Sequence, residues 1–160
     1  APDDSFGKET MGQGPSIVIA SDHAGLTLKD AIRQRLEEAG YAVEDLGTHS
    51  EASVDYPDFA HAVALRIEKE RGQVGILCCG SGIGMSIAAN RHRGVRAALC
   101  CDEEQARLAR LHNDANVLCL GARLLESERA QRIVDTFLAS PFEGGRHEGR
   151  VAKIEKSEAP

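Results

Sequence analysis

The residues best suited to chemistry lie in a glycine-rich segment, residues 74–84, which reads VGILCCGSGIG. An apolar run that stops at a cysteine and opens into alternating glycines predicts a strand, a turn and the start of a helix. Glycines have no Cβ, so the backbone N–H groups of such a turn can approach an anion closely, and the helix N-terminus adds its positive dipole end. The same surroundings favour the thiolate form of a cysteine. The residues of this candidate site are Cys79, Gly80, Ser81, Gly82 and Gly84.

Two adjacent thiols end the apolar run, and they cannot play the same part. Side chains alternate across a strand, so only one of the two can face the end of the sheet where the turn begins. Cys79 is the last residue before the turn and is better placed, whereas Cys78 is predicted to lie in the core. A free cysteine at a strand end can also be a small buried hydrophobe, so the structural interpretation of Cys79 stays open.

Other glycine-rich loops fit this segment poorly. A dinucleotide fingerprint needs a glycine where Met85 stands, and a P-loop needs a Gly-Lys-Ser/Thr ending that the segment lacks. A nucleophile elbow around Ser81 would need a glycine at position 79, which is a cysteine.

Short apolar runs alternate with amphipathic segments along the rest of the chain. The expected strands cover 16–20, 41–46, 74–79, 95–100 and 116–120. The expected helices cover 26–39, 58–71, 84–92, 102–112 and 126–139, with 141–150 irregular and a last helical turn within 150–157. Strands separated by helices become parallel neighbours through right-handed crossovers. The alternation therefore predicts an α/β domain, a three-layer α/β/α sandwich around a five-stranded parallel sheet.

Such folds bind ligands beyond the carboxyl ends of their strands. Asp22 and His23 directly follow the first strand, and Arg123 follows the fifth. They are expected at the same edge of the sheet as Cys79. Asp22 has an equally good structural interpretation as a cap of the helix that follows it. His23 is a candidate acid, base or phosphate ligand, although an isolated histidine is as often structural.

His112 and Asn113 lie at the end of the predicted helix 102–112, just before the fifth strand. The amino end of that strand lies opposite the edge that carries Cys79. Within one chain, His112 and Cys79 are therefore expected to lie far apart, whereas a neighbouring subunit can place its His112 beside Cys79. Alternatively, His112 complements the negative end of its helix, and Asn113 or Asn116 takes a left-handed conformation.

A third cluster, residues 142–150, carries Arg146 and Arg150 among glycines. Two such arginines can converge on a phosphate with bidentate geometry, although a solvated tail is an equally good interpretation. The histidines lack zinc-ligand spacing and the cysteines lack paired Cys-x-x-Cys arms, so the sequence indicates no metal site.

Composition limits the classes of function. The 160 residues suit one domain at 16–160, preceded by a flexible extension at 1–15. A formal net charge of −6 argues against a general nucleic-acid-binding or membrane-binding surface, and no apolar run is long enough to span a bilayer. Five cysteines, an odd number, do not make a disulfide framework, so a reducing cytoplasm is expected.

Taken in order along the chain, these clusters resemble the type B ribose-5-phosphate isomerases and their sugar-phosphate isomerase relatives, from about Ile17 to Ile154. The motifs that carry the resemblance are Ser21-Asp22-His23-Ala24-Gly25, Asp55-Tyr56-Pro57, residues 79–84, Arg91, residues 112–117, Gly121-Ala122-Arg123 and Gly144-Gly145-Arg146-His147. Ser81 stands where some members have threonine and keeps the hydroxyl. The resemblance implies a Rossmann-like sandwich and a homodimer, or a dimer of dimers, whose active sites draw residues from two subunits.

The resemblance also implies a cofactor-free interconversion of ribose 5-phosphate and ribulose 5-phosphate, a reaction of the pentose phosphate pathway. Cys79 as thiolate would move a proton between C2 and C1 through a cis-enediolate, which the N–H groups of the turn and Ser81 would stabilise. His112, with Asp22 as candidate partner, would help to open the sugar ring. The implied substrate contacts are His23, Arg123, Arg146 and Arg150 to the phosphate and Tyr56 and Asn113 to the sugar.

Two other classes of function and a second class of substrate stay open. A nucleotide-binding regulatory domain would use the same glycine turn for a pyrophosphate, but it would not need His112 or the late arginines. A cysteine phosphatase should carry an arginine where this chain has Met85. Within the isomerase interpretation, hexose 6-phosphates such as those of allose or galactose also suit the scaffold.

Overall fold

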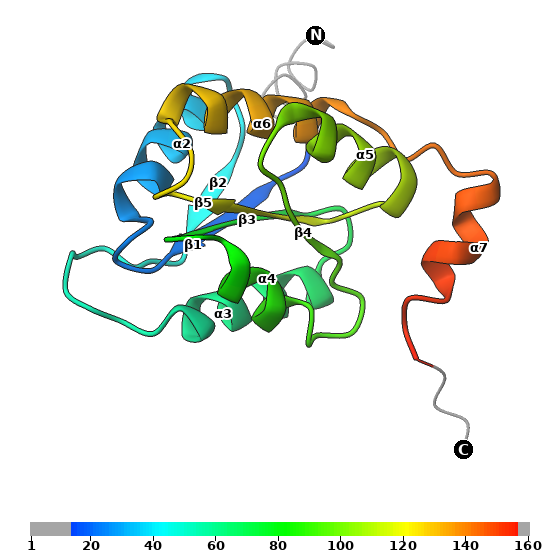
Figure 1. Cartoon of the computed structure of the whole chain (residues 1–160), viewed down its shortest axis with the longest axis horizontal. Helices are drawn as coiled ribbons and strands as arrows, with labels where there is room; N and C mark the ends of the chain where they lie inside the picture. The colour runs from blue at the N-terminus through cyan, green and yellow to red at the C-terminus, as the bar shows by residue number, and fades with distance from the viewer. Residues whose placement is uncertain (1–13, 157–160) are drawn as a thin grey trace, which may run out of the picture.

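A five-stranded parallel sheet forms the middle layer of the structure, a computed structural model that describes residues 14–156 (Figure 1). The strands are β1 (Ile17–Ser21), β2 (Val43–Asp45), β3 (Val74–Cys79), β4 (Ala97–Leu99) and β5 (Val117–Gly121). They lie in the order β2-β1-β3-β5-β4, and every neighbouring pair is parallel. The predicted α/β class is confirmed. Residues 1–13, which make up most of the expected N-terminal extension, lie outside the described residues.

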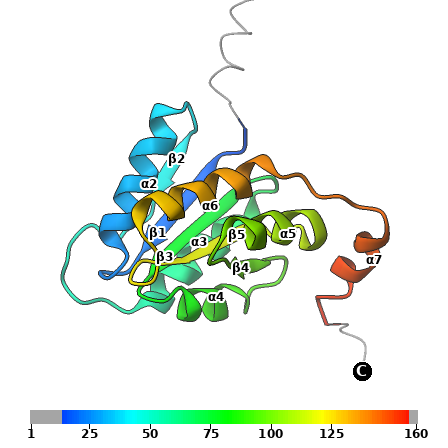
Figure 2. The same cartoon turned by 45° about the horizontal axis from the view of Figure 1, so that its top comes forward.

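Helices cover both faces of this sheet. They are α2 (Leu26–Glu38), α3 (Tyr56–Lys69), α4 (Ile83–Ala89), α5 (Glu103–Asn113), α6 (Ser127–Ala139) and α7 (Arg146–Ala152). Figures 1 and 2 show α2, α5 and α6 on one face and α3 and α4 on the other, with α7 beside the end of α5 and away from the sheet. None of the helices in residues 14–156 is long and apolar enough to cross a bilayer.

Side chains alternate along each strand, so neighbouring residues of one strand pack in different core clusters on the two faces of the sheet. Ile17 and Ile19 pack in the cluster with α2, α5 and α6, whereas Val18 and Ala20 between them pack in the cluster with α3 and α4. Successive side chains of a strand point to opposite faces, so a strand buried on both sides reads as one continuous apolar run. Gly75 lets α3 approach closely, because a Cβ there would lie 2.6 Å from Cγ1 of Val63.

Two helices, α3 and α7, start two or more residues before their expected starts. α3 begins at Tyr56, before the predicted start, because Pro57 falls in the first turn, where its missing N–H costs no hydrogen bond. The expectation of irregular structure over 141–150 was wrong at its end, since α7 starts at Arg146. Gly144 and Gly145 have φ of +72° and +57° and form the turn before this helix, and their presence masked the helix-forming residues that follow.

A buried ammonium group fixes the connection after β2. Lys29 of α2 has no exposed surface, and its Nζ donates hydrogen bonds to Oδ1 of Asp45 over 2.8 Å and to the carbonyl oxygen of Thr48 over 2.6 Å. A buried cation needs such partners because removal from water is costly. The pair therefore holds the start of the 46–55 connection against α2, on the way to the first turn of α3.

Candidate active site

The turn after β3 is built around the thiol of Cys79. This residue ends β3, is 4% exposed, and its Sγ accepts a hydrogen bond from the backbone N–H of Gly82 over 3.2 Å. Gly82 has φ of +80°, and a Cβ there would lie 2.6 Å from Cδ1 of Leu99, so both its conformation and its surroundings require glycine. The turn therefore directs a backbone donor at the sulfur.

Ser81 supports the start of the helix that follows. Its Oγ accepts a hydrogen bond from the backbone N–H of Ile83, the first residue of α4, over 3.2 Å. Its carbonyl packs on β5, because a Cβ at Gly121 would lie 2.5 Å from the Ser81 oxygen. Ser81 is thus held between the turn and β5, with its hydroxyl beside the helix N-terminus.

Two other glycines of the turn make room for side chains from distant elements. A Cβ at Gly84 would lie 2.4 Å from the ring of Tyr56, at the start of α3, and a Cβ at Gly80 would lie 2.9 Å from Nη1 of Arg123, which follows β5. The missing Cβ atoms thus leave space for Tyr56 and Arg123, which flank the turn.

The segment after β1 packs directly on the end of β3. The backbone N–H of Asp22 donates to the carbonyl oxygen of Cys78 over 3.2 Å, and Oδ1 of Asp22 accepts from the N–H of Gly25 over 3.0 Å. A Cβ at Gly25 would lie 2.3 Å from the same Cys78 oxygen. The N-cap residue of α2 is Gly25 rather than Asp22, whose carboxylate closes the turn before that helix.

His23 is oriented by the loop that precedes α3. Its Nδ1 accepts a hydrogen bond from the backbone N–H of Val54 over 3.2 Å. A neutral His23 therefore carries its proton on Nε2. This leaves Nε2 as the ring atom that can donate to an anion at the carboxyl edge of the sheet.

The register of the sheet brings these residues to one edge. Ser21 pairs with Cys78, and Cys79 pairs with Gly121, so the segments after β1, β3 and β5 emerge together. This placement was predicted from the strand order along the chain. The members of this group, called here the turn cluster, are Asp22, His23, Tyr56, Cys79, Gly80, Ser81, Gly82, Gly84 and Arg123.

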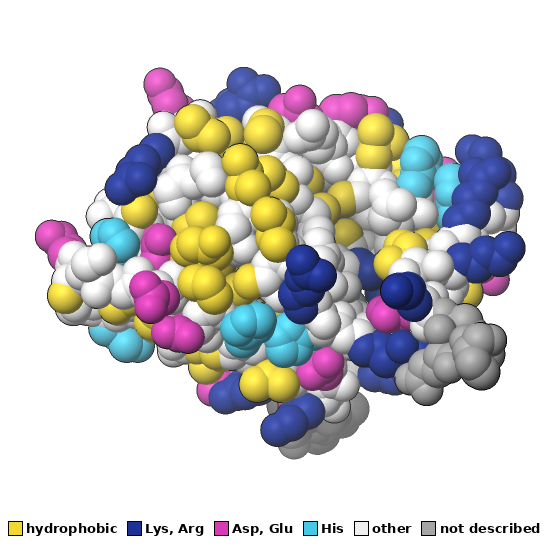
Figure 3. All heavy atoms as spheres, turned by 60° about the horizontal axis from the view of Figure 1, so that its bottom comes forward, with side chains coloured by type: hydrophobic (Ala, Val, Ile, Leu, Met, Phe, Trp, Pro, Cys, Tyr) yellow, Lys and Arg dark blue, Asp and Glu magenta, His cyan; other side chains and the backbone are white. Residues whose placement is uncertain are grey.

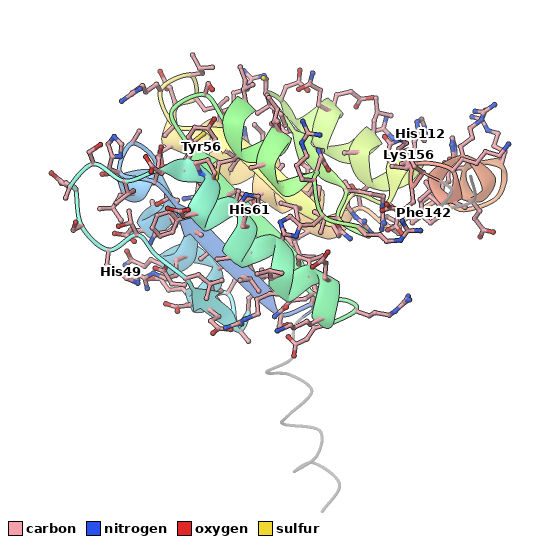
Figure 4. All side chains as sticks on the ribbon, turned by 90° about the horizontal axis from the view of Figure 1, so that it is seen from below. His49, Tyr56, His61, His112, Phe142 and Lys156 are labelled. Atoms are coloured by element: carbon pink, nitrogen blue, oxygen red, sulfur yellow. The ribbon has the colours of Figure 1, made fainter. Side chains whose placement is uncertain are left out.

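The structure does not bring His112 to the turn cluster within one chain. His112 and Asn113 end α5, ahead of β5, whose first residue, Val117, pairs with Gly75 near the start of β3. Cys79 lies at the other end of β3. Figure 4 shows Tyr56, beside the turn, and His112 well apart on the molecule.

His112 instead belongs to a second group at the α5 and α7 end. Its ring stacks on that of His147, with centroids 4.3 Å apart and ring planes 17° apart. Oε1 of Glu143 lies 3.2 Å from Nε2 of His147 and 4.0 Å from Nε2 of His112. Arg146 and Arg150 lie in the same short helix as His147. We call this group the α7 cluster, and its members are His112, Asn113, Glu143, Arg146, His147 and Arg150.

Sequence reasoning assigned no role to Glu143 or His147. The two lie four residues apart, but Glu143 precedes α7, which begins at Arg146, so this spacing is not a helical signal. The expected left-handed residue was also wrong, because Asp114, rather than Asn113 or Asn116, has a positive φ of 49°. Asn116 is structural, since its Oδ1 accepts from the N–H of Arg96 over 2.8 Å.

Three other thiols are expected to be unreactive. Burial raises the pKa of Cys78 and of Cys119 far above the ordinary value for a thiol, and it raises the pKa of Cys100 to about 12. Desolvation penalises the charged thiolate, and neighbouring thiols add to the effect. These residues stay protonated at neutral pH. Cys79 differs from them in accepting a backbone hydrogen bond at the edge of the sheet.

A surface hollow lies at the amino ends of β3 and β5, away from the turn cluster. Gln73, Arg96, Asp114 and Asn116 are among the residues that line it, and Cys79 and His112 are not. Three of its charged groups pair with each other, since Asp114 lies 3.5 Å from Arg96 and 2.9 Å from Arg110. No residue of the turn cluster lines this hollow.

Comparisons with known proteins agree with the site geometry. A protein-family model described as Ribose/Galactose Isomerase matches residues 17–154. A ribose 5-phosphate isomerase from Thermotoga maritima has a solved structure that is 55% identical, covers 89% of this chain and 99% of that one, and has a TM-score of 0.87. The structure of ribose-5-phosphate isomerase B from Mycoplasma genitalium with bound ribulose-5-phosphate is 48% identical, covers 87% and 93%, and has a TM-score of 0.84.

A curated relative from Escherichia coli gives the same result. Ribose-5-phosphate isomerase B of strain K12 is 46% identical over 138 residues, which are 86% of this chain and 93% of that protein. The similarity thus covers both the turn cluster and the α7 cluster. The chain belongs to the Ribose/Galactose Isomerase family.

Proposed function

We propose that this protein is an aldose-ketose isomerase that interconverts ribose 5-phosphate and ribulose 5-phosphate. The observation that carries the proposal is the position of Cys79, which ends β3 and accepts a hydrogen bond from the N–H of Gly82. The family membership, and the relative from Mycoplasma genitalium with bound ribulose-5-phosphate, support the choice of a pentose phosphate.

Cys79 acts as the base in this mechanism. Its thiolate takes the proton from C2 of the open-chain aldose, and the electron pair of the broken C–H bond forms the C1–C2 double bond as the carbonyl electrons move onto O1. The product is a cis-enediolate with its charge on O1, and the proton of the C2 hydroxyl then moves from O2 to O1. As the thiol returns its proton to C1, the electron pair on O2 forms the C2 carbonyl of the ketose. Backbone N–H groups of the glycine turn, with Ser81, stabilise the negative oxygen because they are fixed before the charge develops.

His112 opens the furanose ring, with Asp22 as its candidate partner. An imidazole can both remove the proton of the anomeric hydroxyl and donate one to the ring oxygen. Within one chain, the carboxylate of Asp22 is engaged by the N–H of Gly25 and lies in the turn cluster, whereas His112 lies in the α7 cluster. The two meet only if separate subunits supply them.

The remaining polar residues hold the substrate. His23, Arg123, Arg146 and Arg150 bind the phosphate, and Tyr56 and Asn113 contact the sugar. His23 and Arg123 come from the turn cluster, while Arg146 and Arg150 come from α7. Guanidinium groups suit this task because they bind phosphate oxygens in pairs.

A homodimer, alone or as half of a tetramer, completes the site. Large apolar side chains are exposed on α3 and α4 beside the turn cluster: Tyr56, Leu65, Ile83 and Ile87 are between 40% and 54% exposed. Figure 3 shows hydrophobic side chains gathered on this side of the molecule. Such a patch next to an incomplete site favours contact with a second subunit, whose α7 cluster would face Cys79.

The reaction needs no cofactor. The charge of the enediolate is met by backbone dipoles, and the proton stays on protein groups. A chelator should therefore leave the rate of isomerisation undiminished. The five cysteines, all free in the structure, suit a reducing cytoplasm.

A substrate comparison tests the proposal. The initial rate of ketose formation is measured with ribose 5-phosphate, allose 6-phosphate and galactose 6-phosphate at equal concentrations. We expect kcat/KM to be highest for ribose 5-phosphate. A higher value for either hexose phosphate would replace the pentose assignment, and no turnover of any of the three would overturn the isomerase assignment.

A further inference from the structure

Three ligand-type side chains converge at the α5 and α7 end of the molecule. They are His112, Glu143 and His147, and their ligand atoms all lie within 4.8 Å of one another. His112 comes from α5, His147 from α7, and Glu143 from the segment between α6 and α7. In Figure 4, His112 and Phe142, the neighbour of Glu143, are labelled at the same end of the structure.

The buried ring nitrogen of His147 accepts or donates no hydrogen bond within residues 14–156, although a carboxylate lies beside it. His147 is 6% exposed, and its Nε2 has no hydrogen-bond partner among the described residues. Oε1 of Glu143 lies 3.2 Å away, but it is not directed for a hydrogen bond. Buried polar atoms are almost always satisfied, because leaving one unpaired costs stability. Nε2 of His147 and Oε1 of Glu143 thus lie 3.2 Å apart without a hydrogen bond, which suits two atoms that bind a shared ligand.

The donor set identifies the class of ligand. Two imidazole nitrogens and one carboxylate oxygen are ligands that Zn²⁺ accepts, and three protein ligands leave a fourth position for water. We propose that His112, Glu143 and His147 form a binding site for a divalent transition-metal ion, with Zn²⁺ as the ion to test. The ligand spacing along the chain did not indicate this site, because His112 is far from the other two in the sequence.

One side chain must turn for the ion to bind. The rings of His112 and His147 are nearly parallel, with planes 17° apart, so no ion can lie in both ring planes at once. The side chain of His112 is 38% exposed and that of Glu143 is 55% exposed, so both have room to rotate. His147 is held by burial and supplies the fixed ligand.

The other histidine pair of the chain provides a comparison. Nδ1 of His61 lies 2.7 Å from Nε2 of His92, and Nδ1 of His92 lies 3.5 Å from Oε1 of Glu68. His92 faces its two neighbours with opposite ring nitrogens, so the three groups do not converge on one point. This second group has the same residue types, but its ligand atoms do not converge, so it serves as the control.

Occupation of the site has a consequence for activity, and this consequence rests on the proposed function. An ion bound to Nε2 of His112 removes the group that opens the sugar ring. Zn²⁺ is therefore expected to inhibit the isomerase reversibly, and a chelator should restore the rate.

Direct binding tests the proposal without using activity. The parent protein carries Cys79→Ala and Cys101→Ser, because thiols also bind zinc. The metal-free parent is titrated with Zn²⁺ in competition with a chromophoric chelator. We expect the variants Glu143→Gln and His147→Asn to bind Zn²⁺ at least about tenfold more weakly than the parent. The matched variants Glu68→Gln and His92→Asn should keep the parent affinity.

Two further measurements keep the test decisive. Co²⁺ bound to the parent should give the intense visible absorption of a four-coordinate site, and Glu143→Gln should lose it. The circular dichroism and melting temperature of each variant show whether it has folded. Equal zinc affinity in the parent, Glu143→Gln and His147→Asn would overturn the site, as would no binding by the parent. If the wild-type protein does not turn over any of the sugar phosphates, this result counts against the proposed function and not against the metal site.

Discussion

Cys78 and Cys79 are neighbours in β3, yet their side chains lie on opposite faces of the sheet. Cys78 packs in the cluster with α2, α5 and α6, and Cys79 packs in the cluster with α3 and α4. Only Cys79 accepts the hydrogen bond from Gly82. The pleat of the strand thus gives two adjacent thiols different surroundings, and only Cys79 lies against the glycine turn.

This separation predicts different effects for two alanine substitutions. Cys79→Ala should lower kcat about 10²- to 10⁴-fold, because it removes the group that carries the proton. Cys78→Ala should retain substantial activity, with a small loss of stability from the cavity. Steady-state kinetics with ribose 5-phosphate measure both. Equal kcat values in wild type and Cys79→Ala would remove the assignment of Cys79 as base.

Thiol labelling provides a second test of the same site. Iodoacetamide should inactivate a Cys101→Ser parent by modifying Cys79, and saturating ribose 5-phosphate should slow the reaction because the sugar covers the thiol. Cys78, Cys100 and Cys119 should stay unmodified in the folded protein, since burial raises the pKa of each. Peptide mass spectrometry identifies the modified residue. Inactivation without modification of Cys79 would contradict this prediction.

The sequence predicted the turn cluster better than the α7 cluster, for a physical reason. The strands are continuous apolar runs, and parallel topology alone places the residues after β1, β3 and β5 at one edge, so Cys79 and Arg123 were placed correctly. The stack of His112 on His147 depends on where α7 docks against α5, which no local pattern specifies. Gly144 and Gly145, which precede α7, also favoured the prediction of irregular structure there. The filling of space by Tyr56 beside Gly84 likewise depends on tertiary packing.

The buried pair of Lys29 and Asp45 predicts a large effect on stability. Asp45→Ala should lower the free energy of unfolding by about 3 kcal/mol, because it leaves a fully buried ammonium without its carboxylate. Asp30→Ala is the matched control. Its carboxylate lies 3.8 Å from the same Nζ but is 49% exposed, so its loss should cost less than about 1 kcal/mol. Urea unfolding at one protein concentration measures both, and equal losses would contradict the prediction.

The arginines of α7 should act mainly in binding. Arg146→Ala and Arg150→Ala should each raise KM for ribose 5-phosphate about 10- to 100-fold and lower kcat much less, because a phosphate contact stabilises the bound substrate and the transition state equally. Arg132→Ala should leave KM unchanged and serves as the control, because Arg132 of α6 is 55% exposed and pairs with Glu103. Unchanged KM in both α7 variants would exclude this helix from phosphate recognition.

The separation of His112 from Cys79 predicts complementation between subunits. Homodimers of Cys79→Ala and of His112→Ala should both be nearly inactive, because every site lacks one group. In a heterodimer of the two variants, a shared arrangement puts both defects into one site. The other site combines the intact cysteine of one chain with the intact histidine of its partner.

Differently tagged chains, co-expressed and purified as heterodimers, measure this directly. With two independent sites, the heterodimer should regain up to about half of the wild-type activity per dimer. Sites built within single chains give no recovery, since each chain still carries one lesion. The inactive homodimers, treated with the same tags and purification, control for contamination by wild-type enzyme. A confirmed heterodimer as inactive as its parents would require His112 to reach Cys79 within one chain, and α5 would then have to leave its present position at the amino end of β5.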